Sequence, residues 1–162
     1  FTLQAVAFRG DYDNFINQQV VRGAFTPQDP AVFQFVNFSE VEIDGFEARA
    51  EMRLDSGWNA RLALALANGD ILNPGAAPVP LDTIDPFTVV SGLGYRDPGG
   101  RFGGELILTH NGRKDAGEVE RAANGSELFV RPDASTILDL TAFLAISDRL
   151  KLRAGLFNLT NE

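Results

Sequence analysis

Residues 45–54 read GFEARAEMRL, and the alternation in this stretch decides the fold. The even positions after Gly45 are apolar, whereas the odd positions alternate between Glu and Arg. A strand sends successive side chains to opposite faces, but a helix with a period of 3.6 would spread the same residues around its surface. The stretch is therefore predicted to be a strand with one apolar face and one charged face, on which each Glu neighbours an Arg.

The same alternation recurs along the chain and predicts an all-β protein. We expect strands at residues 1–17, 32–54, 58–67, 87–96, 101–111, 136–146 and 150–159. The first is the least regular, because Val6 and Phe8 oppose its apolar parity. The second is longer than the ~3–10 residues usual for soluble strands. The fold expected is an antiparallel up-and-down meander of about seven long strands.

The predicted connections alternate in length. Short turns are expected at residues 55–57, 97–100 and 147–149, and long loops at 18–31, 68–85 and 112–133. Alternate connections of a meander lie at opposite ends, so one end has tight turns and the other large loops, as in outer-membrane barrels. Trp58, Tyr95 and Phe102 lie beside short turns on the apolar parity, where an aromatic girdle is expected at a membrane interface.

Composition excludes several classes of protein. The chain has 162 residues, no cysteine and a net charge of −8, which argues against a thiolate metal site and against a nucleic-acid partner. No apolar run is long enough for a membrane-spanning helix. The alternation also fits a soluble lipocalin-like barrel or a sandwich with its apolar face turned inward. The alternating loops, the aromatic residues at the turns and the scarcity of Lys favour the membrane barrel.

The chain is expected to be a segment of a larger barrel, because lipid permits no open sheet edge and about seven strands cannot close. The sequence starts inside an alternating run at Phe1 and stops just after another, which also predicts a piece of a longer protein.

Short motifs resemble successive landmarks of TonB-dependent outer-membrane receptors. They are YDNFI at residues 12–16, FQFVN at 33–37, IDGFE at 43–47, PLDTIDP at 80–86, LDL at 138–140 and GLFNLTN at 155–161. Their order and spacing make the resemblance to this family specific. Within the family, the chain looks most like the receptor branch for heme, hemoglobin, transferrin and lactoferrin. The resemblance covers nearly the whole chain.

This resemblance implies that residues 1–162 form strands near the C-terminus of a plugged, 22-stranded barrel in the bacterial outer membrane. The plug, the earlier strands and the closing strand would lie outside this chain. The implied function is active import of an iron carrier, heme or a ferric siderophore, energised by TonB through the missing N-terminal part, with outer-membrane lipid around the barrel. A passive porin or small outer-membrane barrel is the first alternative, and a soluble ligand-binding β-barrel is the second.

Charged side chains on the polar parity are expected to point into the lumen, where they pair with each other or contact the plug. These are Glu47, Arg49, Glu51, Arg53, Arg61, Glu105, Asp139, Lys151 and Arg153. The candidates for ligand binding are His110, the only histidine, and the loop carboxylates Asp82, Asp85 and Asp115, with Glu118 and Glu120 nearby. Solvated loop charge is the ordinary interpretation of these carboxylates.

The sequence offers no catalytic constellation. The single His110 has no readable Ser-His-Asp arrangement, and no acidic cluster has calcium-loop spacing. We therefore expect no enzyme activity, no metal site and no cofactor. The sequon at residues 124–126 is a weak match without relevance in a bacterium.

Overall fold

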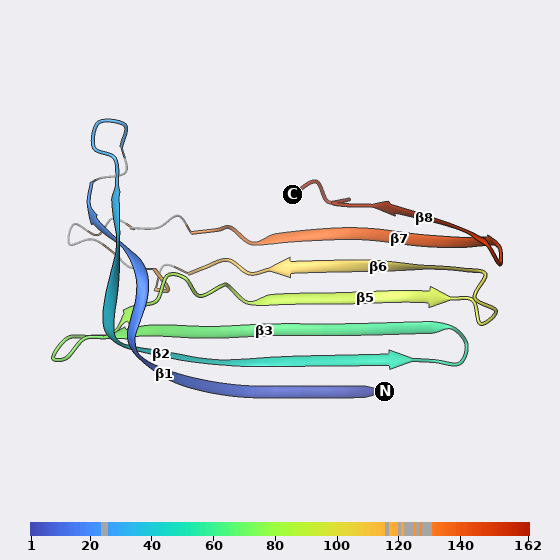
Figure 1. The fold of residues 1–162 in the computed structure, drawn as a ribbon, viewed down its shortest axis with the longest axis horizontal. Helices are drawn as coiled ribbons and strands as arrows, with labels where there is room; N and C mark the ends of the chain where they lie inside the picture. The colour runs from blue at the N-terminus through green and yellow to red at the C-terminus, as the bar shows by residue number, and fades with distance from the viewer. Residues whose placement is uncertain (24–25, 116, 120, 122–124, 126, 128–130) are drawn as a thin grey trace.

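The computed structural model describes residues 1–162 except 24–25, 116, 120, 122–124, 126 and 128–130. Its strands are β1 (Thr2–Arg22), β2 (Val32–Arg53), β3 (Trp58–Leu72), β4 (Val79–Pro80), β5 (Thr88–Arg96), β6 (Phe102–Asn111), β7 (Ser135–Ser147) and β8 (Leu150–Leu156). They form one antiparallel sheet in the order β1-β2-β3-β5-β6-β7-β8, with the short β4 paired to β3 (Figure 1). The predicted all-β meander is confirmed, and the sheet is open between β1 and β8 across the described residues.

The register gives the sheet two chemically different faces. Ala48 of β2 lies opposite Leu64 of β3, which lies opposite Val89 of β5. One position along, Arg49 lies opposite Ala63. Directly opposed residues share a face, so the register joins the alternating runs into one apolar face and one polar face. Many leucines of the apolar face are exposed, such as Leu93 at 54%, whereas Leu64 is half-buried.

Three expected strand ends are wrong, because pairing with a neighbouring strand, and not the alternating pattern, sets where a strand ends. β1 continues to Arg22 rather than ending at residue 17, since it pairs with the uncharged first part of β2. β3 continues to Leu72 rather than ending at residue 67, because its last residues pair with β2 as far as Glu40. β8 ends at Leu156, three residues short of the expected end. Backbone hydrogen bonds, rather than side-chain alternation, set these ends.

The tight turns and the long loops lie at opposite ends of the sheet, as predicted (Figure 1). At the β2–β3 turn the N–H of Leu54 donates to the carbonyl of Trp58 at 2.8 Å, and Gly57 has a φ of 96° that favours glycine. The expected aromatic girdle is present beside the turns. The ring centroids of Trp58 and Tyr95 are 5.3 Å apart, and those of Tyr95 and Phe102 are 5.9 Å apart.

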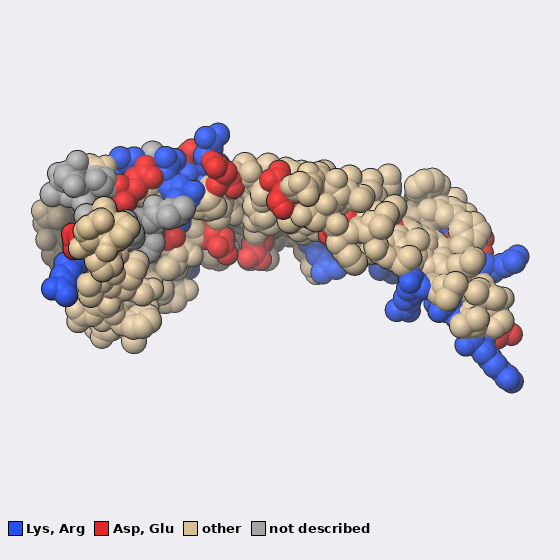
Figure 2. Space-filling view, turned by 90° about the horizontal axis from the view of Figure 1, so that it is seen from above, with Lys and Arg blue, Asp and Glu red and all other residues tan. Residues whose placement is uncertain are grey.

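The buried apolar cluster of the loop end consists of Val41, Ile71 and Leu81. Phe15 and Phe38, from the far part of the β1–β2 hairpin, pack against it. The hairpin turns out of the line of the other strands there (Figure 1). In Figure 2 the loop end forms a lobe that projects to the same side as the Lys and Arg side chains of the turn end. The hairpin is therefore held against the loop end by apolar packing.

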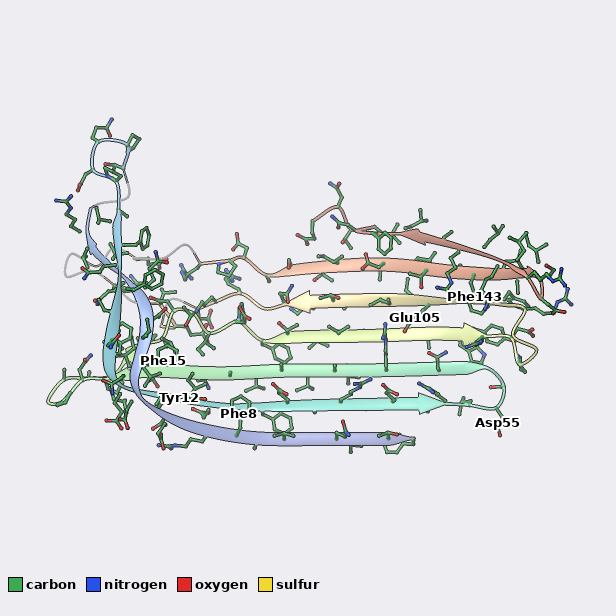
Figure 3. All side chains as sticks on the ribbon, viewed as in Figure 1. Phe8, Tyr12, Phe15, Asp55, Glu105 and Phe143 are labelled. Atoms are coloured by element: carbon green, nitrogen blue, oxygen red, sulfur yellow. The ribbon has the colours of Figure 1, made fainter. Side chains whose placement is uncertain are left out.

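Two glycines on the polar face lie beneath aromatic rings of the neighbouring strand. Phe8 lies opposite Gly45, and Phe143 lies opposite Gly103 (Figure 3). A Cβ at Gly103 would lie 2.6 Å from Cε1 of Phe143 and 2.7 Å from the carbonyl oxygen of Tyr95. Glycine at this position therefore lets the ring lie close against the backbone.

We expect Gly103→Ala to lower the free energy of unfolding of the full-length protein by ~1–3 kcal/mol, because the backbone carbonyl of Tyr95 cannot move aside. Gly117→Ala is the matched control, since a Cβ there meets no described atom within 4 Å. Denaturant titration of both variants measures the difference. An equal effect of the two changes would contradict the close packing at Gly103.

Candidate functional site

The polar face carries all of the charged residues that the sequence predicts to face a lumen. The strand register places them together: Glu47, Arg49, Glu51 and Arg53 on β2, Arg61 on β3, Glu105 on β6, Asp139 on β7, and Lys151 and Arg153 on β8. This shared face is the first part of the candidate site. Its side chains form a charged wall that crosses the sheet from β2 to β8.

Ion pairs run along and across this wall. Arg49 hydrogen-bonds to Glu51 on the same strand, and Arg53 lies 3.7 Å from the other oxygen of that carboxylate. Arg61 Nε lies 2.8 Å from Glu105 Oε1, although β5 separates their strands. Gly92 makes this possible, because a Cβ at that position would lie 2.7 Å from both atoms. These pairs are partly exposed, so each contributes only ~0–1 kcal/mol of stability. These ion pairs hold the charged side chains in defined positions on the polar face.

A basic and aromatic cluster lies on the same face near the tight turns, around the ring of Phe143 (Figure 3). The guanidinium carbon of Arg96 is 5.6 Å and the Nζ of Lys151 is 4.9 Å from the ring centroid. Arg153 lies directly opposite Phe143. A hollow of about 620 Å³ adjoins these side chains. Both cations are within cation–π range, so the ring orders two like charges on one side of the sheet.

Sequence reasoning missed this cluster. The available signal was an aromatic residue, Phe143, at a polar-parity position of β7. Only the register showed that it faces Gly103 on one side and Arg153 on the other.

A buried ammonium group joins two loops at the other end of the sheet. Lys114 is 6% exposed and follows β6. Its Nζ donates hydrogen bonds to the carbonyl oxygens of Asp82 and Ile84, the latter at 2.8 Å. A buried charge requires such partners, since desolvation without them costs several kcal/mol. Lys114 therefore ties the loop after β6 to the loop between β4 and β5.

A chain of charged contacts continues from this lysine. Arg131 donates to the carbonyl of Lys114 at 3.3 Å and to the carboxylate of Glu127 at 2.8 Å. Arg121 donates to the other oxygen of Glu127 at 2.9 Å. The hydrogen bond from Arg131 lowers the pKa of Glu127, and the charges of both arginines act in the same direction against partial desolvation. The carboxylate therefore stays ionised and holds both arginines.

The predicted loop carboxylates come together beside this lysine. Asp85 and Asp115 line a cavity of about 420 Å³ with Arg113, Lys114 and Glu118. The described residues include no group of three or more acidic or histidine side chains arranged to hold a metal ion. The cavity thus mixes both signs of charge and is framed by the two tied loops.

The remaining predicted positions lie elsewhere. Asp82 contributes its carbonyl to Lys114. His110 lies on the apolar parity near the loop end, where its Nδ1 is 2.9 Å from the hydroxyl of Thr136. Glu120 and the sequon at residues 124–126 are not covered by the description, apart from Gly125. Within the described part of the chain there is no helix of the length and apolarity needed to cross a membrane.

We expect Lys114→Met to loosen both loops, because methionine fills the space but leaves the two carbonyls without a donor. Protease cleavage within residues 73–87 should become about tenfold faster in the full-length protein on intact cells. Lys151→Met is the control, since that exposed lysine makes no contact with the loops. Unchanged cleavage in Lys114→Met would show that the buried ammonium does not hold the loops.

Comparison with known proteins agrees with this geometry. The family model described as the β-barrel of TonB-dependent receptors matches residues 1–159. A hemoglobin and hemoglobin-haptoglobin-binding protein of Haemophilus ducreyi is 25% identical over 96% of this chain and 19% of its own length. A lactoferrin-binding protein A of Neisseria meningitidis is 32% identical over 50% of this chain and 9% of its own. The chain therefore spans only about a fifth or less of these relatives.

Solved structures show the same fold. A copper transporter superposes with a TM-score of 0.75 at 22% identity, over 99% of this chain and 23% of that chain. A ferric enterobactin receptor of Pseudomonas aeruginosa gives a TM-score of 0.65 at 20% identity, over 97% of this chain and 23% of that one. With the family match over almost all of its residues, the chain belongs to the TonB-dependent receptors of the bacterial outer membrane, as part of their β-barrel.

Proposed function

We propose that this chain is part of the wall of an importer that carries an iron carrier across the outer membrane. The observation that carries the proposal is the division of the sheet into a continuous apolar face and a continuous charged face. Lipid solvates the first and water inside the barrel bathes the second. The family match over residues 1–159 supports a receptor rather than an enzyme.

The exposed apolar face supports the membrane arrangement over the soluble alternatives. Leu62 is 42% and Leu66 is 39% exposed, and no second layer covers them among the described residues. A soluble barrel or sandwich would pack these leucines inside. Charged side chains such as Arg49 and Glu51 lie on the opposite face, where a water-filled lumen solvates them.

The preferred cargo is heme taken from a heme-carrying host protein. The support is the names of relatives that bind hemoglobin and its haptoglobin complex, which match up to 96% of this chain. A ferric siderophore is the second candidate, and the likeness to the enterobactin receptor bears on the fold alone. The sequence-predicted contact with TonB belongs to the same proposal, through parts of the receptor outside this chain.

The charged wall and the basic cluster around Phe143 are proposed to contact what fills the lumen. Three cations of that cluster, Arg96, Lys151 and Arg153, have no carboxylate within 4.0 Å among the described residues. A plug domain with acidic side chains would satisfy them. A passive porin, the remaining alternative, would leave the lumen open and would need no energy from TonB.

The test is growth of an iron-starved Gram-negative strain that lacks other iron-carrier receptors and expresses the full-length receptor, with hemoglobin as the sole iron source. We expect growth that is lost when either the receptor or TonB is deleted. Growth that persists without TonB would favour the porin. Growth on a ferric siderophore but not on hemoglobin would overturn the preferred cargo and leave the importer.

The face assignment predicts unequal effects of two neighbouring substitutions. Leu64→Arg, on the apolar face, should lower the free energy of unfolding of the lipid-embedded barrel by ~2–4 kcal/mol. Ala63→Arg, on the charged face, should cost much less because the guanidinium reaches water. Denaturant unfolding in lipid vesicles measures both. Similar costs for the two variants would contradict the assignment of the two faces.

A further inference from the structure

The charged wall leaves one group of cations without an acidic partner. Arg49 and Arg53 both contact the carboxylate of Glu51, and Arg61 contacts that of Glu105. Three cations that line the hollow near the tight turns form no ion pair with a carboxylate in the described part of the chain. These are Arg96, Lys151 and Arg153. The cations of the wall on β2 and β3 are therefore neutralised, whereas those beside the hollow are not.

The strand register brings these three cations together. In one row across the sheet Arg96 lies opposite Gly103, Gly103 lies opposite Phe143, and Phe143 lies opposite Arg153. Lys151 precedes Arg153 by two residues of β8 and so shares its face. The ring of Phe143 attracts both Arg96 and Lys151, which keeps them close to each other. Like charges held this close repel, so an anion bound among them is favoured.

The hollow beside these cations has the size of a small-molecule site. Its volume of about 620 Å³ lies within the range of ~300–1,000 Å³ usual for ligand pockets. Asn59 and Thr141, which lie in the same row as Glu105, also line it, so it opens on the charged face. Glu105 contributes a carboxylate, but that carboxylate is already paired with Arg61 at 2.8 Å. The hollow is therefore positively charged, in a chain whose net charge is −8.

The hollow lies at the end of the sheet assigned to the periplasm. In outer-membrane barrels the short turns are periplasmic and the long loops are extracellular. Arg96 is the last residue of β5 and Lys151 is the second residue of β8, so both adjoin tight turns. A molecule that crosses the lumen from the loops therefore reaches these cations last, once the proposed plug has moved out of its way. Clustered positive charge raises the local concentration of anions and steers them toward it.

We propose that Arg96, Lys151 and Arg153 form an exit site, which binds the carboxylates of the imported iron carrier before the carrier enters the periplasm. The proposal rests on the proposed function. Heme, the preferred cargo, carries two carboxylates, and a guanidinium and an ammonium group both form charge-assisted hydrogen bonds with such groups. The three side chains are exposed, so water weakens each contact. Weak contacts suit a site that must release its ligand.

The test measures uptake of radiolabelled iron by cells that express the full-length receptor and no other iron-carrier receptor. The probes are globin reconstituted with heme and globin reconstituted with heme whose carboxylates are methyl esters. The unaltered receptor is compared with the double variant Lys151→Gln, Arg153→Gln. We expect the ratio of the uptake rates, acid over ester, to be about tenfold lower in the double variant, because esterification and substitution remove the same interaction.

Two further variants guard this comparison. Arg149→Gln is the matched control, since it removes an exposed cation from the turn before β8 that does not line the hollow. Its acid-to-ester ratio should equal that of the unaltered receptor. Arg96→Gln repeats the test from β5, in case the double variant fails to assemble. Binding of hemoglobin to the cell surface, which takes place at the loop end, should be unchanged in every assembled variant.

The outcomes separate the exit site from the proposed function. If the unaltered receptor imports no heme, the proposed cargo is wrong and the exit site falls with it. If heme enters and the acid-to-ester ratio is the same in all variants, the exit site is overturned and the cargo stands. A variant that slows both probes equally and admits vancomycin without TonB would assign the cations to holding the plug, which also overturns the exit site.

Discussion

The requirement that backbone groups be hydrogen-bonded without water governs this structure. In a bilayer, each N–H and C=O of a spanning strand must pair with a neighbouring strand, which forces a continuous sheet. Once the strands pair in register, their alternating side chains combine into two faces. The apolar face can then contact acyl chains, and the charged face from Glu47 to Arg153 can contact water. The two faces are thus a consequence of strand pairing combined with period-two sequence.

Close packing on the polar face depends on residues that lack a side chain. Gly92 lets Arg61 and Glu105 meet across β5, and Gly103 lets the ring of Phe143 lie on β6. The ring in turn orders Arg96 and Lys151. Glycine weakens a strand in isolation, so its presence at these positions indicates that interactions over the backbone outweigh that loss. The positions of these charged side chains therefore depend on glycines that leave room for them over the backbone.

The loop end is organised differently, by burial and buried charge rather than by alternation. Val41, Ile71 and Leu81 form the apolar cluster against which the hairpin packs. Lys114 and the Arg121–Glu127–Arg131 contacts connect the loops. At the same end β3 stops at Leu72, opposite Glu40, so the described pairing between β2 and β3 ends there.

The sequence by itself determined the all-β meander, the two faces and the end at which each loop lies, because period-two alternation and turn residues are local signals. Its short motifs, such as YDNFI at residues 12–16, also resemble those of its family. Only the tertiary structure decided that β1 reaches Arg22 and β3 reaches Leu72, because those ends depend on a partner strand. Only the tertiary structure also decided that Phe143 lies beside Arg96 and Lys151 and that Lys114 is buried. Their roles come from residues distant in the chain, and no local pattern encodes which strands become neighbours.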